Sequence, residues 1–224
     1  MGKVFIGMEC SGVIRRAMAS RGHDVISADY KPAEDVSTSH IVGDVFESLN
    51  MLAKERGWWP DLAIFQPTCT YLTYAAEWAF GDGPYHQKVK SETIVGRARW
   101  VKRHEAVTQC QKILNLPIKK MALENPRGYL TKAIRKPDQT IQPYQFGDDA
   151  SKATCLHLVN LPRLTFTSFY PPRFVDGKPR WSNQTDMGQS RVGPQGGNEA
   201  RAAERSRTYQ GLADAIADQW GSLV

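Results

Sequence analysis

At 224 residues the chain can bury roughly 70% of the surface it exposes when unfolded, so one core needs no metal or disulfide to hold it. A hydrophobic content of 41% and a mean hydropathy of −0.46 are typical of a soluble globule, and no apolar run approaches the ~20 residues of a membrane span. A formal charge of +6 and a pI of about 9.2 favour a polyanionic partner.

The cysteines and the first residues of the sequence indicate the cellular compartment in which we expect the protein. Cys10, Cys69, Cys110 and Cys155 are widely spaced and form no C-x-x-C pair, so neither a zinc site nor a disulfide framework is suggested. Reduced thiols fit the cytosol. The opening residues, MGKVFIGMEC, begin a strand at once and lack the layout of a signal peptide. We therefore expect a cytoplasmic protein without a metal and without a membrane contact.

The N-terminal part alternates predicted strands and helices. A strand at Lys3–Gly7 leads through a small-residue turn into a helix over 13–21, a layout that presents backbone N–H groups to a nucleotide-like ligand. An ordinary turn between a strand and a helix remains an equal alternative. A second strand, Asp24–Asp29, ends in an acid about 20 residues after the turn, where such folds hydrogen-bond a ribose. A third, 40–45, contains Asp44, which is placed to reach the exocyclic amine of a base.

Two later strands end in residues that can do chemistry. The strand 62–66 runs into Pro67, so Cys69 lies just past its carboxyl end, and the strand 120–124 stops at Glu124-Asn125-Pro126. If these strands are neighbours, a thiol and a carboxylate face one crevice at the edge where open α/β sheets bind ligands. Taken alone, the cysteine is most simply a small buried hydrophobe and the glutamate a turn residue. The combination at matching strand ends favours an active site.

The segments around these strand ends are basic and aromatic. Residues 78–85 are rich in glycine and aromatic side chains, and we interpret them as a lid over the crevice. A helix is predicted over 92–116, with an apolar stripe of Trp100, Val107, Cys110 and Leu114 that packs on the sheet and with the arginines elsewhere. Six lysines and arginines against two acids in 88–105, and six against one in 119–136, flank the candidate residues.

The C-terminal part mixes strands with a loop-rich stretch. A short helix is predicted over 129–134, paired strands over 140–146 and 154–159, loop from 160 to 207, and an amphipathic helix from 208 to 223. These elements predict an α/β fold with a mostly parallel, doubly wound sheet. We expect a catalytic domain formed by 1–154 and 206–224, and a short loop-rich recognition segment at 155–205.

The order of these features resembles the cytosine-C5 DNA methyltransferases, most closely their small, single-domain members of phage-like contexts. Phe5-x-Gly7 is similar to the first family motif, and Pro67-Thr68-Cys69 to its Pro-Pro-Cys nucleophile loop. Glu124-Asn125-Pro126 is similar to Glu-Asn-Val, and Tyr209-Gln210-Gly211 to the last motif, which folds back beside the first strand. Lys152 takes the place of the family arginine that contacts the O2 atom of the base, because the Gln-Arg-x-Arg motif is poorly matched here.

The resemblance implies a Rossmann-like fold, S-adenosylmethionine as cofactor with S-adenosylhomocysteine as product, and double-stranded DNA with a flipped cytosine as substrate. We expect a monomer. It assigns catalysis to Cys69 and Glu124. The cofactor-binding residues that it implies are Phe5, Gly7, Glu9, Ser11, Gly12, Asp29, Tyr30, Asp44, Val45, Pro67 and Gly211. The DNA-binding residues that it implies are Thr68, Asn125, Pro126, Lys152, Thr154, Arg205 and Arg207.

The chemistry requires the same two groups. Addition of a thiolate at C6 of cytosine, with a carboxyl group hydrogen-bonding N3, makes C5 nucleophilic enough to accept a methyl group. Two alternatives stay open: a related thiol-dependent transferase that acts on a free nucleotide or places another group, and an inactive DNA-binding relative. Intact Cys69 and Glu124 argue against the second. An amino-directed methyltransferase is disfavoured, since Gln66-Pro67-Thr68-Cys69 lacks the acid or amide and the aromatic that would position an exocyclic amine.

Overall fold

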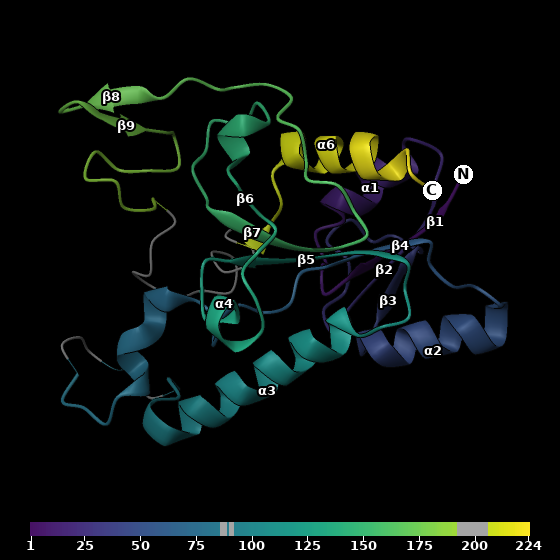
Figure 1. The fold of residues 1–224 in the computed structure, drawn as a ribbon, viewed down its shortest axis with the longest axis horizontal. Coiled ribbons are helices and arrows are strands. Elements are labelled where there is room, and N and C mark those ends of the chain that lie inside the picture. Colours follow the sequence, from purple (N-terminus) through teal and green to yellow (C-terminus); the bar gives the residue numbers. More distant parts are fainter. Residues whose placement is uncertain (86–88, 90–91, 192–205) are drawn as a thin grey trace.

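A computed structural model describes residues 1–85, 89, 92–191 and 206–224 (Figure 1). Its strands are β1 (Lys3–Gly7), β2 (Asp24–Asp29), β3 (His40–Val42), β4 (Leu62–Phe65), β5 (Lys120–Pro126), β6 (Gln139–Ile141), β7 (Thr154–Val159), β8 (Arg173–Val175) and β9 (Lys178–Arg180). Its α-helices are α1 (Val13–Ala19), α2 (Val45–Arg56), α3 (Gly96–Leu114), α4 (Leu130–Ala133) and α6 (Gln210–Gly221), and its 3₁₀ helices are η1 (Tyr74–Phe80) and η2 (Pro143–Gln145). No helix in the described ranges has the length and apolar character needed to cross a bilayer.

The seven-stranded sheet has the order β3-β2-β1-β4-β5-β7-β6. The strands from β3 to β5 are parallel, and β7 runs antiparallel between β5 and β6. This confirms the predicted mostly parallel, doubly wound sheet. The reversed β7 next to β5 distinguishes it from the all-parallel dinucleotide-binding order.

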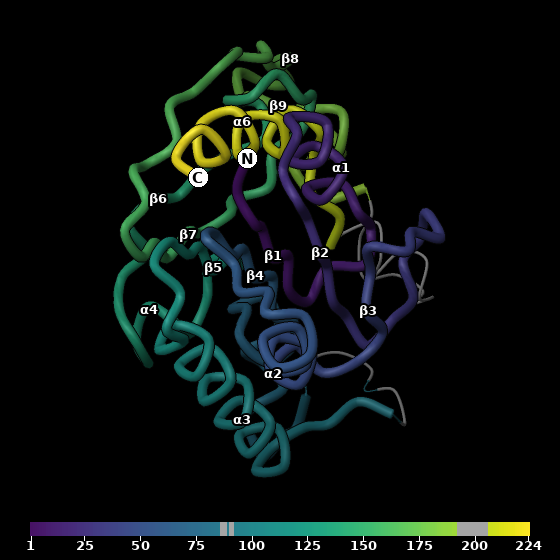
Figure 2. Tube along the Cα trace, turned by 90° about the vertical axis from the view of Figure 1, so that its right-hand side faces the viewer, coloured from purple at the N-terminus to yellow at the C-terminus, as the bar shows by residue number. Residues whose placement is uncertain are grey.

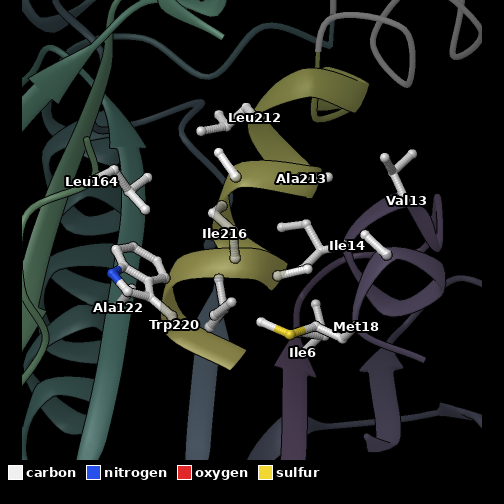
Figure 3. Packing of buried hydrophobic residues seen from close by; sticks show 14 of the residues in the cluster. Ile6, Val13, Ile14, Met18, Ala122, Leu164, Leu212, Ala213, Ile216 and Trp220 are labelled. Carbon is white, nitrogen blue, oxygen red and sulfur yellow. The ribbon is translucent and has the colours of Figure 1, made fainter. Parts of the chain in front are cut away.

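Helices cover both faces of the sheet (Figure 2). Helices α1 and α6 lie on one face, and α2, α3 and α4 lie on the other. In Figure 3 Ile216 of α6 lies close to Ile14 of α1, with Met18 of α1 and Ile6 of β1 below them. The C-terminal helix therefore folds back beside the first strand, as the family resemblance implied. Apolar β1 and β4 residues are buried between the two layers, which fixes the direction in which their carboxyl ends leave the sheet.

Several predicted boundaries were wrong. The strand β3 ends at Val42, and Asp44 is instead the N-cap of α2, where its side chain accepts from the N–H groups of Phe46 and Glu47. Helix α3 begins only at Gly96. Trp100 is 43% exposed, so it does not belong to the buried stripe. The side chains that α3 does bury include two arginines; its buried residues are Gly96, Arg99, Arg103, Val107, Cys110 and Ile113.

The C-terminal region also differs in part from the prediction. The strand expected over 140–146 covers only Gln139–Ile141, because Pro143 begins η2. The predicted domain boundary at residue 155 falls inside β7, which pairs with β5, so the chain leaves the sheet only after Val159. Strands β8 and β9 form a hairpin in the segment expected to be loop. Asp176 and Gly177 join them with positive φ angles of 50° and 71°, the conformation of a tight hairpin turn.

Candidate active site

Strands β4 and β5 are parallel neighbours, with Leu62 opposite Lys120 and Phe65 opposite Leu123. The segment that contains Cys69 and the Glu124-Asn125-Pro126 segment therefore leave the sheet at the same edge, because parallel strands end on the same side. This was the condition on which the predicted crevice depended. The Cys69 residue is exposed, and its carbonyl accepts from the N–H groups of Leu72 and Thr73 in a tight turn.

Two further contacts hold the strand ends together. The Asn125 side chain is 1% exposed, and its Nδ2 atom donates to the carbonyl oxygen of Pro67 over 3.0 Å. The N–H of Tyr129 donates to the carbonyl oxygen of Leu72 over 2.7 Å. A Cβ atom on Gly128 would lie 2.1 Å from that same carbonyl oxygen, so the approach requires a glycine. The loop 67–73 and the segment 125–129 are thus packed as one unit.

Glu124 lies in a partly buried setting on β5, opposite Leu156 of β7. Burial raises the pKa of its carboxyl group, while the charge of Lys152 and a hydrogen bond from Thr154 act in the opposite direction. The amino group of Lys152 donates to the carbonyl oxygen of Arg207 over 3.4 Å. A carboxyl group in this setting keeps its proton to a higher pH than an ordinary glutamate, because burial raises its pKa.

A small cavity lies beside Glu124. It has a volume of about 20 Å³, which is room for one water molecule and far less than a nucleobase needs. Its polar lining comes from Gln66, Glu124, Lys152, Thr154 and Thr208. Gln66 also binds the C-terminal segment, since its Nε2 atom donates to the Thr208 hydroxyl over 2.7 Å. The oxygen Oδ1 of the neighbouring Asn125 is buried without a hydrogen-bond partner among the described residues.

The loop after β1 is built around a buried carboxylate. Glu9 is 5% exposed and accepts from the Ser11 hydroxyl and from the N–H of Gly12, while burial raises its pKa. Burial also raises the pKa of the Cys10 thiol, and the charges of Asp29, Glu34 and Glu9 add to this effect. Asp29, Glu34 and Glu9 therefore lie near the Cys10 thiol, while Lys31 acts on it in the opposite direction and Glu34 pairs with Arg207.

The carboxyl groups of Asp29, at the end of β2, and Asp44, at the start of α2, already accept hydrogen bonds within the protein. One oxygen of Asp29 accepts from the N–H of Lys31 over 2.9 Å. Asp44 accepts from the Tyr30 hydroxyl over 2.7 Å as well as from its helix. Burial acts against ionisation of Asp44, but these hydrogen bonds and the charge of Lys112 hold its pKa below the usual range. Both carboxyl groups lie at the same edge of the sheet as the Glu9 loop, as the sequence predicted.

Other predicted cofactor contacts lie in the core. The side chains of Phe5 and Val45 are 0% and 2% exposed and belong to the cluster between the sheet and α2. A Cβ atom on Gly7 would meet the Phe65 ring at 2.5 Å, so close packing explains this glycine. At Gly211 a Cβ atom would lie 2.0 Å from the carbonyl oxygen of Phe146, which again is a packing requirement.

The residues predicted to contact DNA differ in how exposed they are. Thr68 is exposed and Pro67 buried in the Cys69 loop, Pro126 is partly exposed, and Thr154 is 4% exposed beside Glu124. Arg207 pairs with Glu34. Arg205 lies outside the described residues. Sequence reasoning missed the buried arginines of α3, whose spacing of four residues within an apolar helix face was the available signal.

In the part of the chain that the structure describes, no group of three histidine, cysteine or acidic residues is arranged to hold a metal ion. The side chains described at the edge that carries Cys69 and Glu124 include a thiol, carboxyl groups, amides and a cationic group. This set suits nucleophilic and acid–base chemistry on an organic substrate.

Comparison with known proteins identifies no family. No family model matches the sequence, and no curated protein matches it. Among solved structures, the fold is similar to one described as a candidate DNA modification methyltransferase encoded within a prophage (E. coli), with a TM-score of 0.42 and 10% sequence identity. The match covers 70% of this chain and 46% of that one, so this chain spans less than half of the neighbour's length.

Proposed function

We propose that the protein is an S-adenosylmethionine-dependent DNA methyltransferase that modifies C5 of cytosine. The observation that carries the proposal is the hydrogen bond from Asn125 to the carbonyl of Pro67 between the ends of two paired parallel strands. It joins the segment that carries the exposed Cys69 thiol to the segment that carries the Glu124 carboxyl group. A nucleophile and a proton donor at one sheet edge are the two groups that addition to a cytosine ring needs.

In the proposed reaction the Cys69 thiolate adds to C6 of a cytosine swung out of the duplex, and Glu124 shares its proton with N3. C5 thereby gains electron density and becomes the nucleophile. Methyl transfer would leave S-adenosylhomocysteine; a water molecule then takes up the C5 proton, the electron pair of that C–H bond forms the C5–C6 double bond, and the thiolate departs, which restores the aromatic ring. Extruding the base costs a few kcal/mol, which contacts of the protein with the DNA must offset.

The loop after β1 suits this cofactor. S-adenosylmethionine, when bound, supplies an electrophilic methyl group on a sulfonium cation. Glu9 and Asp29, which both act on Cys10, are the acidic groups that would be available to that positive charge and to the ammonium group of the cofactor. Asp29 and Asp44 at the neighbouring strand ends would accept hydrogen bonds from the ribose and the adenine.

Removing the Asp29 carboxylate should weaken S-adenosylmethionine binding by about tenfold or more, because a charge-assisted hydrogen bond contributes ~1.5–3 kcal/mol. Isothermal titration calorimetry of Asp29→Ala measures this directly. Glu55→Ala is the control, since it removes an exposed carboxylate from the far end of α2. Unchanged affinity in both Asp29→Ala and Asp44→Ala would eliminate the proposed cofactor site.

The segment after β7 supports DNA as the substrate. It exposes large apolar side chains, among them Phe166, Phe169 and Phe174, at 54%, 65% and 69%. Figure 1 shows its hairpin, β8 and β9, beyond the carboxyl ends of the sheet strands. The basic residues of the segment and its continuation are Arg163, Arg173, Lys178, Arg180, Arg191, Arg201 and Arg205. Cations of this kind contact phosphates and give affinity without reading sequence.

We expect low sequence selectivity, because this short segment is too small to build a second lobe with its own core. Bisulfite sequencing of a treated plasmid should find modified cytosines in many contexts that share a very short common sequence. DNA affinity should fall steeply as salt concentration rises. Modification confined to one site of four or more defined bases would show that the segment reads bases after all.

The choice of substrate distinguishes the proposal from its closest alternative. The protein should be incubated with methyl-labelled S-adenosylmethionine and either duplex DNA or free deoxycytidine monophosphate. We expect acid-insoluble label from DNA and none in the nucleotide. Label transferred only to the free nucleotide would favour the related transferase, and binding of DNA without any transfer would favour an inactive relative.

A further inference from the structure

Two buried arginines of α3 lie against the loop that carries Cys69. Arg99 and Arg103 are 5% and 1% exposed. The Nη2 atom of Arg99 donates to the carbonyl oxygen of Thr70 over 2.8 Å, and Nε of Arg103 donates to that of Tyr71 over 2.8 Å. Consecutive carbonyl groups directly after Cys69 are thus bound by consecutive turns of one helix.

The positive charge of Arg103 is balanced by the carboxylate of Glu77. Its guanidinium donates to both carboxylate oxygens of Glu77 in η1, over 3.0 and 2.7 Å. It also lies 3.4 Å from the centre of the Phe80 ring and 4.4 Å from that of Tyr129. The pairing holds η1 against α3, so the start of the segment that we predicted to be a lid is anchored to this helix.

Arg99 is different, because it makes no salt bridge with a described residue. Its second hydrogen bond is to the carbonyl oxygen of Ile94 over 3.0 Å, and its Nε atom is buried without a partner in the described part of the chain. The guanidinium also lies 4.9 Å from the centre of the Phe80 ring and 5.1 Å from that of Tyr71. Burial lowers its pKa, and Arg103 acts in the same direction, whereas Tyr71 and Glu77 act in the opposite one. A leucine or methionine would fill such a site at lower cost. The cation is therefore explained by what it contacts: the Thr70 and Ile94 carbonyl groups and the rings of Tyr71 and Phe80, of which Thr70 and Tyr71 belong to the Cys69 loop.

The loop that carries Cys69 has carbonyl groups that need a hydrogen-bond donor from outside the loop. The carbonyl group of Cys69 is bound by Leu72 and Thr73, which closes the turn, but the carbonyl groups of Thr70 and Tyr71 point away from it toward α3. The bond from Arg99 to the Thr70 carbonyl is charge-assisted and therefore stronger than a neutral hydrogen bond, so removing the guanidinium would favour a different turn conformation. Catalysis by a nucleophile is sensitive to such changes, since a 1 Å misplacement can cost about 10²-fold in rate.

We propose that Arg99 is a positioning residue that holds the Cys69 loop against α3 through the Thr70 carbonyl and so sets the orientation of the thiol. The link to catalysis rests on the proposed function, whereas the anchoring of the loop does not. Arg99→Gln should therefore loosen the loop locally and lower turnover without weakening DNA binding.

The test uses hydrogen exchange and kinetics on the full chain. In Arg99→Gln the amides of Leu72 and Thr73, which close the Cys69 turn, should exchange about tenfold faster or more. The kcat should fall by about 10- to 100-fold with the KM for DNA within about twofold of the wild type. Arg99→Lys should recover part of both effects, because an ammonium can still donate to the Thr70 carbonyl. Lys102→Gln, a control on the same helix whose native side chain pairs with Glu105, should change neither.

The outcomes separate the inference from the proposed function. Unchanged exchange at Leu72 and Thr73 would overturn the positioning role, as would faster exchange with an unchanged kcat. Should Arg99→Gln fail to fold, Arg99→Lys decides the question by the same two readouts. If the wild type transfers no methyl group, the proposed function fails, while exchange in Arg99→Gln still tests whether the arginine anchors the loop.

Discussion

Replacing the Cys69 thiol with a hydroxyl should abolish methyl transfer while leaving the fold and DNA binding intact. A serine hydroxyl has a much higher pKa than a thiol and is not nucleophilic enough to add to C6 of cytosine. The substitution is nearly isosteric at an exposed position, so the melting temperature should not change. Turnover of Cys69→Ser on duplex DNA, measured with labelled cofactor, should fall below detection.

Trapping the covalent adduct identifies the sulfur involved. Wild-type protein with cofactor should form a denaturation-resistant complex with DNA that contains 5-fluorocytosine, because fluorine at C5 cannot leave as a proton does. Cys10→Ser is the matched control and should still form the complex, since burial and the nearby carboxyl groups raise the pKa of the Cys10 thiol and make it a poor nucleophile. A complex formed equally well by Cys69→Ser would assign the nucleophile to another cysteine.

Glu124→Gln should lower turnover by about 10²-fold or more, with a smaller change in DNA affinity. The amide keeps a hydrogen-bonding group at the same place but cannot share a proton with N3. Burial raises the pKa of Glu124, so its protonated form persists to a higher pH than in an ordinary glutamate. Wild-type turnover should therefore decline as pH rises through this pKa, and the variant should lack that decline.

Glu105→Gln, on the exposed side of α3, provides the control for this experiment. Steady-state kinetics of the three proteins between pH 5 and pH 9 would separate the effects on kcat and KM. If Glu124→Gln changed only the KM for DNA, the carboxyl group would have a binding or structural role.

The strands that carry the site were predictable because their sequences are short and apolar and end abruptly. Leu62–Phe65 is followed by Pro67, and the β5 residues before Glu124 are equally apolar, so both strands could be located from the sequence alone. Their adjacency was a condition of the predicted crevice, and the structure meets it in the way that consecutive strands of α/β chains commonly pair. The hydrogen bond between Asn125 and Pro67 was not predictable, since it joins positions far apart in sequence.

The errors have physical causes as well. Asp44 was taken as the end of a strand, although an aspartate before a helix is a common N-cap, and the capping contacts explain its position. Arg99 and Arg103 were assigned to a polar face because arginine is rarely buried. Their partners are loop carbonyl groups and aromatic rings that the sequence does not reveal. The hairpin signal Asp176-Gly177 was obscured by Pro179, which is tolerated because β9 is an edge strand.

Identification of the methylated atom tests the central claim most directly. Duplex DNA should be incubated with the protein and methyl-labelled S-adenosylmethionine, digested to nucleosides and separated against standards. The label should coelute with 5-methyldeoxycytidine and should be absent when Cys69→Ser is used. Label in N4-methyldeoxycytidine or N6-methyldeoxyadenosine would contradict the assignment of Cys69 and Glu124 to addition at C6 of cytosine.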